Sequence, residues 1–402
     1  MRVPEYDVAV VGGGPAGATA AADLAEAGRS VVLIDRDGRI KPCGGAIPPR
    51  LLRDFDVPES LLVARAKGAR IFSPSERSVD MGIENGFVGM VDRDTYDEWL
   101  RQRAVAAGAV RRTATFERLE REPDGGVVLH LRPPGAAAGT TEPIRARAVV
   151  GADGANSGVA REAMPKAGRP PFVFAYHEIV RTPSVTPQGY DPTRCDIHYR
   201  GDLSPDFYAW VFPHGDTASI GTGSAHKGFG LRPAVAALRE VCGLAGAETV
   251  RREGAPLPLR PMKCWDDGRA VLLAGDAAGV VAPASGEGIY YAMLSGRLAA
   301  DAIDERLATG DVRALATARR RFMKLHGRVF WILGIMQYFW YSSDKRRERF
   351  VSLCRDPDIQ RLTWQAYLEK ELVRSDPMAH VRIMMRDFAH LFGVVSPWEK
   401  RA

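Results

Sequence analysis

Three glycines near the start of the chain, Gly12, Gly14 and Gly17, have the G-x-G-x-x-G spacing that suits the binding of a dinucleotide. Glycines in this pattern permit a tight turn, the approach of a pyrophosphate to the backbone, and close packing of a helix on a strand. Asp35 follows at about the separation at which an acidic side chain accepts hydrogen bonds from an adenosine ribose. The spacing therefore predicts a dinucleotide site within residues 6–35.

The elements that must position these glycines can be predicted from the residues on either side. Residues 6–11 form a short valine-rich run, as expected for a buried parallel strand, and residues 30–34 predict a second strand. Between them, an alanine-rich segment that extends to Ala27, with Leu24 on its apolar side, predicts a helix with Gly28 at its C-terminal end. The start of such a helix presents free N–H groups to phosphates. A strand-turn-helix unit with chance glycines is the alternative, which the complete pattern disfavours.

Composition limits the class of protein. The 402 residues are enough for about two or three domains, and 46% hydrophobic with 26% charged residues is ordinary for a soluble globular protein. The net charge of +6 is too weak and dispersed to predict nucleic-acid binding, although it suits an anionic membrane surface or anionic substrates. Five scattered cysteines without a C-x-x-C pair predict reduced thiols and no metal site. Without a signal peptide or a long apolar run, we expect a cytoplasmic protein.

Two further features lie between the second strand and residue 108. A loop of prolines and glycines contains Cys43, Gly44 and Gly45, and a glycine pair beside a cysteine lets the backbone approach a flat or bulky group. A small buried residue is the alternative interpretation of Cys43. A helix is then predicted that ends before Gly108, with Arg93 in its first turn. Because a cation there opposes the helix dipole, Arg93 suggests an anion site, with a solvated arginine as the alternative.

Later parts of the chain repeat the strand-and-turn pattern of a nucleotide domain. Residues 146–152 and 270–273 predict buried strands, and each is followed by a turn that carries an acidic residue. A glycine-rich stretch precedes a predicted helix from Ile289 to about Glu305, another helix start suited to anions. Besides the three glycines, Asp35 and Arg93, the candidate cofactor-binding residues come from the first site, from the proline- and glycine-containing loop, and from these later segments. They are Pro15, Ala16, Arg36, Cys43, Gly44, Gly45, Asp153, Gly275, Asp276, Gly286, Gly288 and Ile289.

Residues 170–259 change in character and predict an antiparallel sheet inserted into the nucleotide domain. Within it Tyr208, Trp210 and Phe212 alternate, so all three project from one face of a strand that we expect Pro213 to end. Three large aromatic side chains on one face form an apolar wall, and ordinary core packing is the alternative.

Residues 311–402 are predicted to be helical. Between Phe322 and Arg347 an aromatic segment is flanked by lysines and arginines, which suits a helix lying in a membrane interface. Burial against the sheet or against a second subunit is the alternative, since periodicity alone does not separate the two.

The order of these motifs resembles that of FAD-dependent oxidoreductases of the aromatic-hydroxylase type. The resemblance implies that the first site holds the ADP half of FAD, that Arg93 contacts the phosphates, that Asp276 contacts the ribityl or pyrophosphate region, and that Gly288 lies at the flavin ring. It also implies an α/β fold with three parts. These are a Rossmann-like FAD-binding domain (1–70, 92–165 and 262–310), an inserted antiparallel-sheet substrate domain (71–91 and 166–261), and a helical C-terminal region (311–402).

Two motifs narrow the resemblance. The loop Pro42-Cys43-Gly44-Gly45 and the P-x-x-Y-x-W-x-F-P signature of residues 205–213 resemble those of geranylgeranyl reductases. Similarity is greatest to bacterial enzymes that reduce the geranylgeranyl tail of bacteriochlorophyll to phytyl. The resemblance implies reduction of three isolated C=C bonds, with FAD as cofactor and NADPH as a transient reductant. The alternatives are free geranylgeranyl diphosphate or prenyl ether lipids as substrate, ferredoxin as donor, a flavin monooxygenase, or a non-catalytic carrier.

Such a reaction needs an acid as well as a hydride. Hydride addition to an unpolarised alkene develops cation-like character on carbon, so a nearby group must supply a proton. Cys43 is the first candidate, and Tyr208, Glu287 and Tyr290 are the alternatives. The aromatic side chains of residues 208, 210 and 212 are expected to line the substrate channel. A prenylated substrate further implies peripheral association with the photosynthetic membrane and contact with bacteriochlorophyll synthase.

Overall fold

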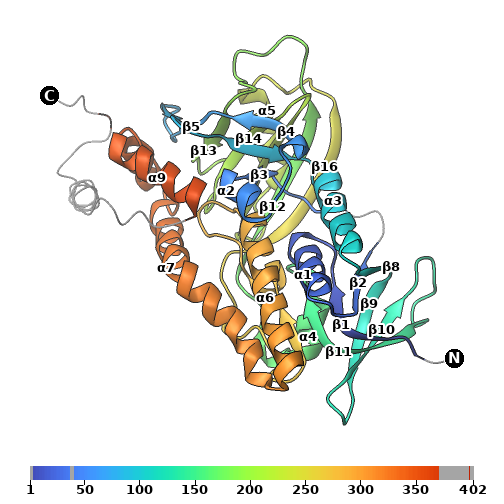
Figure 1. Ribbon diagram of the computed structural model, residues 1–402. Coiled ribbons are helices and arrows are strands. Elements are labelled where there is room, and N and C mark those ends of the chain that lie inside the picture. The colour runs from blue at the N-terminus through green and yellow to red at the C-terminus, as the bar shows by residue number, and fades with distance from the viewer. Residues whose placement is uncertain (1–2, 37–39, 371–397, 399–402) are drawn as a thin grey trace. The chain divides into compact units, whose positions relative to one another are not determined.

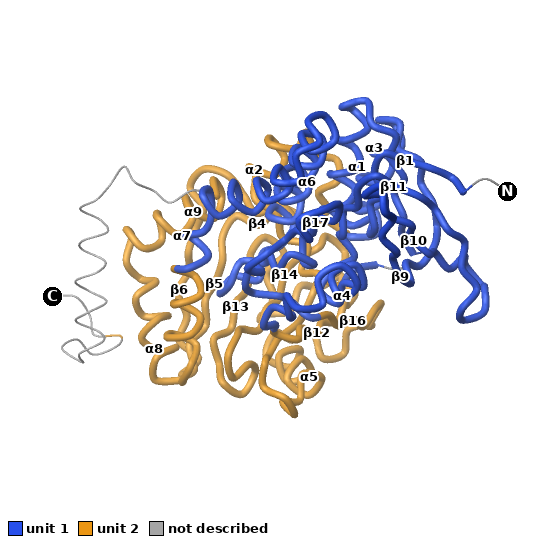
Figure 2. The backbone as a smooth tube through the Cα atoms, turned by 90° about the horizontal axis from the view of Figure 1, so that it is seen from below, with its two compact units in different colours: residues 1–41, 93–172, 256–331 blue, residues 42–92, 173–255, 332–402 orange. Residues whose placement is uncertain are grey.

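The computed structural model describes residues 3–36, 40–370 and 398 (Figure 1). The chain divides into two compact units, each built from three segments (Figure 2). The first unit contains Met1–Lys41, Arg93–Phe172 and Pro256–Trp331, and the second contains Pro42–Asp92, Val173–Ala255 and Ile332–Ala402. The two units are described separately below.

A seven-stranded sheet with the order β8-β2-β1-β11-β10-β9, and with β17 beside β11, forms the centre of the first unit. Its strands are β1 (Glu5–Val11), β2 (Val31–Asp35), β8 (Val110–Thr113), β9 (Thr115–Arg121), β10 (Val127–Arg132), β11 (Glu142–Gly151) and β17 (Val271–Leu273). The pairs of β1, β2, β8, β11 and β17 are parallel, whereas β9, β10 and β11 form antiparallel pairs. The predicted parallel strands at residues 6–11 and 30–34 are confirmed, and their valine-rich centres are fully buried.

The helices of the first unit pack closely beside this sheet. They are α1 (Pro15–Glu26), α3 (Arg93–Ala106), α4 (Gly158–Ala163) and α6 (Ile289–Thr309). Helices α1 and α6 lie side by side (Figure 1), and a Cβ added to Gly296 of α6 would lie 2.2 Å from the carbonyl oxygen of Ala16. Small residues therefore let these two helices approach through their backbones. The predicted alanine-rich helix is present as α1, and the predicted helix start at Ile289 is confirmed.

The second unit contains a seven-stranded sheet with the order β16-β12-β15-β14-β13-β5-β6 and a small sheet with the order β3-β7-β4. The strands are β3 (Ala46–Ile47), β4 (Leu62–Ala66), β5 (Gly68–Phe72), β6 (Ser78–Gly82), β7 (Val88–Val91), β12 (Phe172–Arg181), β13 (Cys195–His198), β14 (Ala209–His214), β15 (Thr217–Ser224) and β16 (Thr249–Pro258). The antiparallel sheet expected in residues 170–259 is present, although β13 pairs with β5 in parallel.

Three features of the second unit differ from the sequence interpretation. Residues 42–70 belong to this unit rather than to the nucleotide domain, because β4 pairs with β7 and β5 pairs with β13. The proline-rich loop leads into helix α2 (Pro49–Asp54), since proline is favourable in the first helical turn. Pro213 lies inside β14 rather than ending it. Strand β13 extends along β14 only to Val211, so the proline occupies an edge-like stretch that tolerates a missing N–H.

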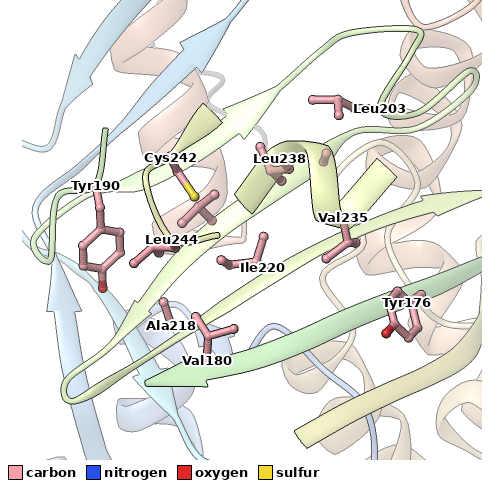
Figure 3. Close-up of a cluster of buried hydrophobic side chains, with 12 residues drawn as sticks. Tyr176, Val180, Tyr190, Leu203, Ala218, Ile220, Val235, Leu238, Cys242 and Leu244 are labelled. Atoms are coloured by element: carbon pink, nitrogen blue, oxygen red, sulfur yellow. The ribbon is translucent and has the colours of Figure 1, made fainter. Parts of the chain in front are cut away.

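Helix α5 (Leu231–Val241), which the sequence interpretation did not include, covers one face of the large sheet. Figure 3 shows its Val235 and Leu238 beside Ile220 of β15 in a buried hydrophobic cluster. Ala209 and Val211 of β14 belong to the same cluster. Because side chains alternate along a strand, the residues between them lie on the opposite face.

The C-terminal part contains α7 (Ala316–Trp340), α8 (Asp344–Leu353) and α9 (Pro357–Glu369), which confirms the helical prediction for residues 316–369. Residues 371–397 of that prediction lie outside the described residues. Along α7, Phe322 and Phe330 are buried, whereas Trp331, Ile335 and Tyr338 are exposed.

The described residues contain no helix long and apolar enough to cross a membrane. Within the same residues, no group of three or more His, Cys, Asp or Glu side chains is arranged to hold a metal ion. None of the five cysteines, all of which lie in the described residues, forms a disulfide bond.

Candidate functional site

The three fingerprint glycines have three different surroundings. Gly12 has a φ of +106°, and an added Cβ would lie 2.3 Å from the carbonyl oxygen of Ala152. A Cβ at Gly17 would lie 1.9 Å from the carbonyl oxygen of Gly12, so helix α1 packs on β1 without room for a side chain. A Cβ at Gly14 would meet no atom within 4 Å. The first and third glycines are therefore required by the fold, whereas the second leaves space for a ligand.

Helix α1 begins as an anion site would require. Gly14 is its N-cap, with extended backbone and no side-chain hydrogen bond to the first turn. Pro15 and Ala16 follow in the buried first turn. Since the first N–H groups of a helix have no partner within it, they are available to a pyrophosphate here. The residues present thus fit the phosphate groups of a dinucleotide.

Asp35 lies at the end of β2 beside this turn. Its Oδ1 accepts the backbone N–H of Arg36 at 2.9 Å, and its Oδ2 lies 3.3 Å from Nη1 of Arg101, which also donates to the carbonyl of Gly13 at 3.3 Å. A Cβ added to Gly13 would lie 2.5 Å from Asp35 Oδ2, so the carboxylate lies directly over the turn. Sequence reasoning missed Arg101. Its position eight residues after Arg93, on the same face of α3, was the available signal.

Arg93 is buried and forms a two-point ion pair with Asp97, with Nε–Oδ1 and Nη2–Oδ2 distances of 2.9 and 2.8 Å. This geometry fixes the plane of the guanidinium. One turn of the same helix is tied to α6, because the hydroxyl of Tyr96 donates to Sδ of Met293 at 3.0 Å. Contact between Arg93 and cofactor phosphates stays a prediction.

Asp153 follows β11 and holds the start of α4. Its carboxylate accepts the backbone N–H groups of Gly158 and Val159 at 2.6 and 3.2 Å, and Ser157 donates its hydroxyl to the same side chain. The Asp153 carboxylate therefore stabilises the turn that leads into α4. The predicted contact of Asp153 with a cofactor stays a prediction.

Asp276 lies just after β17, in a short 3₁₀ turn that starts at Gly275. Its side chain is only 4% exposed and forms an ion pair with Lys41, another residue that the sequence analysis missed. Gly275 has a φ of +63°, which favours glycine, and donates its N–H to Oγ of Ser295 at 2.9 Å. The buried carboxylate therefore has a compensating cation and a fixed position.

The start of α6 brings two of the candidate acids together. Glu287 accepts the backbone N–H of Tyr290 through Oε1 at 3.0 Å, so its carboxyl group caps the helix, and both residues are buried. Gly286 has a φ of +65°, and Gly288 is the N-cap before Ile289. Capping gives Glu287 a structural role that does not require proton transfer.

In the second unit, Tyr208, Trp210 and Phe212 form the expected aromatic wall on the sheet face opposite α5. Their ring centroids are separated by 6.0 Å between the first pair and 6.2 Å between the second. Tyr208 and Trp210 are buried and Phe212 is partly buried. The prediction that the three rings share one face is confirmed.

Further aromatic residues extend the wall beyond Tyr208. The ring of Tyr199 lies 6.1 Å from that of Tyr208, and its hydroxyl is 3.1 Å from the hydroxyl of Tyr341. Phe350 of α8 meets the ring of Tyr199 edge-on at 5.1 Å. Sequence reasoning missed Tyr199 and Phe350. It placed Tyr341 in the aromatic segment of residues 322–347, and the alternative given there, burial against the sheet, holds for this buried side chain.

The loop of residues 42–45, called the cysteine loop below, lies against this wall. A Cβ added to Gly44 would lie 3.1 Å from the ring of Phe212 and 3.8 Å from Nε1 of Trp210. Gly45 has a φ of +70° and donates its N–H to Sγ of Cys43 at 3.4 Å. The structure therefore brings the cysteine loop and the wall together in one unit, as both glycines allow.

Burial sets the protonation states beside the cysteine loop. Burial raises the pKa of Tyr208, with nearby Tyr199 and Cys43 adding to the effect, so this phenol is a poor proton donor. Burial also lowers the pKa of His214 to about 4. Since Nδ1 of His214 lies 3.2 Å from the carbonyl oxygen of Phe212, Nδ1 carries the hydrogen and donates. The unprotonated Nε2 of His214 occupies the space that a side chain at residue 45 would need.

Comparison with known proteins identifies the family. A family model for an FAD binding domain matches residues 5–170. The chain is 55% identical to a geranylgeranyl diphosphate reductase from Rhodobacter capsulatus, over 98% of this chain and 99% of that protein. It is 38% identical to a chloroplastic geranylgeranyl diphosphate reductase from Oryza sativa subsp. japonica, over 96% of this chain and 86% of that protein.

A solved structure agrees with these relatives. The crystal structure of a geranylgeranyl bacteriochlorophyll reductase-like protein from Thermoplasma acidophilum matches with a TM-score of 0.80 and 25% identity, covering 94% of this chain and 100% of that one. The fold is thus the aromatic-hydroxylase-like α/β fold that the sequence predicts. The chain therefore belongs to the geranylgeranyl reductase family of FAD-dependent oxidoreductases, which reduce geranylgeranyl chains.

Proposed function

We propose that this enzyme hydrogenates the three isolated C=C bonds of a geranylgeranyl chain esterified to bacteriochlorophyllide a, with NADPH as the reductant. The observation that carries the proposal is the buried aromatic wall with the cysteine loop against it. The Thermoplasma neighbour, described as geranylgeranyl bacteriochlorophyll reductase-like, supports the pigment as substrate. Family membership does not favour a monooxygenase or a carrier.

The wall suits a long apolar chain. Burying the C20 prenyl chain is worth up to roughly 16 kcal/mol, at ~0.8 kcal/mol per carbon, before the costs of ordering it. The rings of Tyr208, Trp210 and Phe212 supply apolar contact area along one face. Aromatic faces also attract positive charge, so they stabilise the cation-like carbon that develops during reduction of an alkene.

Proton supply is assigned to Cys43. FAD, when bound, supplies the hydride that adds to one alkene carbon. The Cys43 thiol gives its proton to the other carbon, and the resulting thiolate is stabilised by the N–H of Gly45, which already lies 3.4 Å from Sγ. Reprotonation of the thiolate from solvent completes the cycle. Tyr208 is less suited, because burial raises its pKa.

NADPH is proposed to bind transiently, because the chain carries one complete dinucleotide fingerprint and FAD uses it.

Peripheral membrane binding is proposed through an exposed stripe on α7. The stripe runs from cations to apolar side chains at helical spacing, through Lys324, Arg328, Trp331, Ile335 and Tyr338. Contact with a bacteriochlorophyll synthase would deliver the prenylated pigment from that surface.

An anaerobic experiment tests the proposal. The purified protein is reduced with NADPH, geranylgeranyl-bacteriochlorophyllide is added, and flavin reoxidation and product mass are followed. We expect reoxidation with gains of two, four and six hydrogens on the pigment. Reoxidation by free geranylgeranyl diphosphate or a prenyl ether lipid, but not by the pigment, would replace the substrate. No reoxidation by any prenyl chain would contradict the proposed function.

A further inference from the structure

Trp210, the central ring of the wall, is held by a buried chain of hydrogen bonds that takes no part in the proposed binding of FAD or proton transfer. Its Nε1 lies 3.2 Å from Oγ of Ser219, which lies 3.0 Å from Nδ1 of His177. Nε2 of His177 lies 3.0 Å from Oε2 of Glu253, and Nε of Arg251 lies 2.6 Å from the other carboxylate oxygen. The chain runs from the wall to the partly exposed strand β16.

The chemistry of the two ends fixes the direction of these hydrogen bonds. An indole N–H only donates, so Oγ of Ser219 is the acceptor for Trp210. An ionised carboxylate only accepts, so Nε2 of His177 carries a hydrogen and donates to Glu253. The hydroxyl hydrogen of Ser219 needs an acceptor, and Nδ1 of His177 lies 3.0 Å from Oγ in the position to be that acceptor. Ser219 is fully buried and His177 is 4% exposed, so water does not compete for these bonds.

Strand register explains how the two rings meet. Trp210 of β14 and His177 of β12 both pair with Gly221 of β15, which lies between them. A Cβ added to Gly221 would lie 2.2 Å from the indole and 2.6 Å from Cβ of His177. The indole therefore lies over the glycine backbone, with its centroid 6.4 Å from that of the imidazole. Backbone below and hydrogen bonds at Nε1 together define one orientation of the ring.

We infer that Ser219, His177 and Glu253 are positioning residues that hold the Trp210 indole in one orientation and so control how completely a prenyl chain is reduced. The inference rests on the proposed function, in which the wall lines the channel. Three double bonds must reach the same reacting position in turn, so the chain must shift along the wall between reductions. A fixed indole keeps the wall continuous in each position, whereas a loosened ring lets partly reduced chains leave early.

Product analysis of Ser219→Ala tests the inference, with Tyr176→Phe as the matched control. Tyr176 precedes His177 on β12, and its hydroxyl donates to Glu178 on the opposite face. In Ser219→Ala we expect the ratio of partly to fully reduced product to rise about fivefold, the effect of losing one hydrogen bond of typical strength. The rate of flavin reduction by NADPH in Ser219→Ala should equal that of the wild-type protein. The control Tyr176→Phe should keep the wild-type ratio of products. Ser219→Thr, which retains the hydroxyl, should restore the ratio.

A second variant and a spectroscopic readout make the test independent of folding and of turnover. Glu253→Ala, at the partly exposed end of the chain, should raise the same ratio to a smaller extent. Wild-type ratios in both variants would overturn the inference. In protein labelled with fluorinated tryptophan, the Trp210 resonance, assigned with Trp210→Phe, should shift in Ser219→Ala but not in Tyr176→Phe.

An unchanged Trp210 resonance in Ser219→Ala would overturn the positioning role even if the enzyme is active. Failure of the proposed function gives a different result, because the wild-type protein would then form no reduced prenyl product while the resonance still shifts.

Discussion

The fingerprint turn of the first unit and the aromatic wall of the second are built in opposite ways. The turn comes from one continuous stretch, and its chemistry is that of the backbone, with Gly14 left open for a ligand. The wall is assembled from β14, the cysteine loop, and residues as distant as Tyr341, and its chemistry is that of side chains. The fingerprint turn is therefore encoded locally, whereas the aromatic wall depends on tertiary packing.

Substitution of the third fingerprint glycine should have the largest effect. Gly17→Val places a side chain where even a Cβ would lie 1.9 Å from the carbonyl oxygen of Gly12, so helix α1 must move from β1. We expect the free energy of unfolding to fall by about 3 kcal/mol, and FAD binding to be lost as well.

The control is Gly14→Ala, whose Cβ meets no atom. It should keep the stability of the FAD-free protein and weaken FAD binding alone. Thermal unfolding and FAD titration measure the two effects. Equal stability of Gly17→Val and Gly14→Ala would refute the distinction between the two glycines.

The equivalent substitution in the second unit should separate cofactor binding from turnover. Gly44→Val forces the cysteine loop away from the ring of Phe212, which lies only 3.1 Å from the added Cβ. Because a displacement of about 1 Å can cost roughly a hundredfold in rate, we expect turnover to fall by about that factor. FAD content should be unchanged. Gly246→Val, at an exposed position with no close neighbour, is the control, and an equal loss in both variants would argue against the loop's role.

The exposed stripe on α7 gives a prediction about membranes. Trp331, Ile335 and Tyr338 replaced together by serine should lower partitioning onto anionic vesicles by about tenfold, because their apolar area no longer enters the interface. Val185, which is 81% exposed in a loop of the second unit, supplies the control Val185→Ser. Co-sedimentation with vesicles measures both, and unchanged partitioning of the triple variant would exclude this surface.

Two buried histidines make the second unit sensitive to acid. Burial lowers the pKa of His198, which stacks on Phe72 at 4.2 Å, to about 3, and that of His214 to about 4. In the unfolded chain both groups bind protons below about pH 6.5, while the folded protein binds them only near those lower values. Stability is thus complete above pH 6.5 and falls towards pH 4, by up to about 1.4 kcal/mol per pH unit for each histidine.

Urea unfolding from pH 7 to 4 measures this slope. His198→Phe, which keeps an aromatic ring on Phe72, should flatten it. The same slope in the variant and the wild-type protein would show that burial of His198 does not cause the acid sensitivity.

The features that the sequence predicts correctly are those that depend on residues close together in the chain. The turn at Gly12, the helix start at Ile289 and the shared face of the three wall residues each depend on neighbours in the chain. The features that sequence analysis misses are contacts between segments that lie far apart in the chain. The contacts of Arg101 with Asp35 and of Ser219 with Trp210 depend on packing and strand register between different elements, which the local pattern around either residue does not show.

The most direct test of the account is to measure the two half-reactions of Cys43→Ala separately by anaerobic stopped flow. Because the fingerprint turn proposed to bind FAD lies in the first unit and Cys43 lies in the second, flavin reduction by NADPH should proceed at the wild-type rate. Reoxidation by geranylgeranyl-bacteriochlorophyllide should be slower by about a hundredfold or more, the usual effect of removing a general acid. Wild-type reoxidation in Cys43→Ala would contradict the assignment of the cysteine loop and the wall as the site of prenyl reduction.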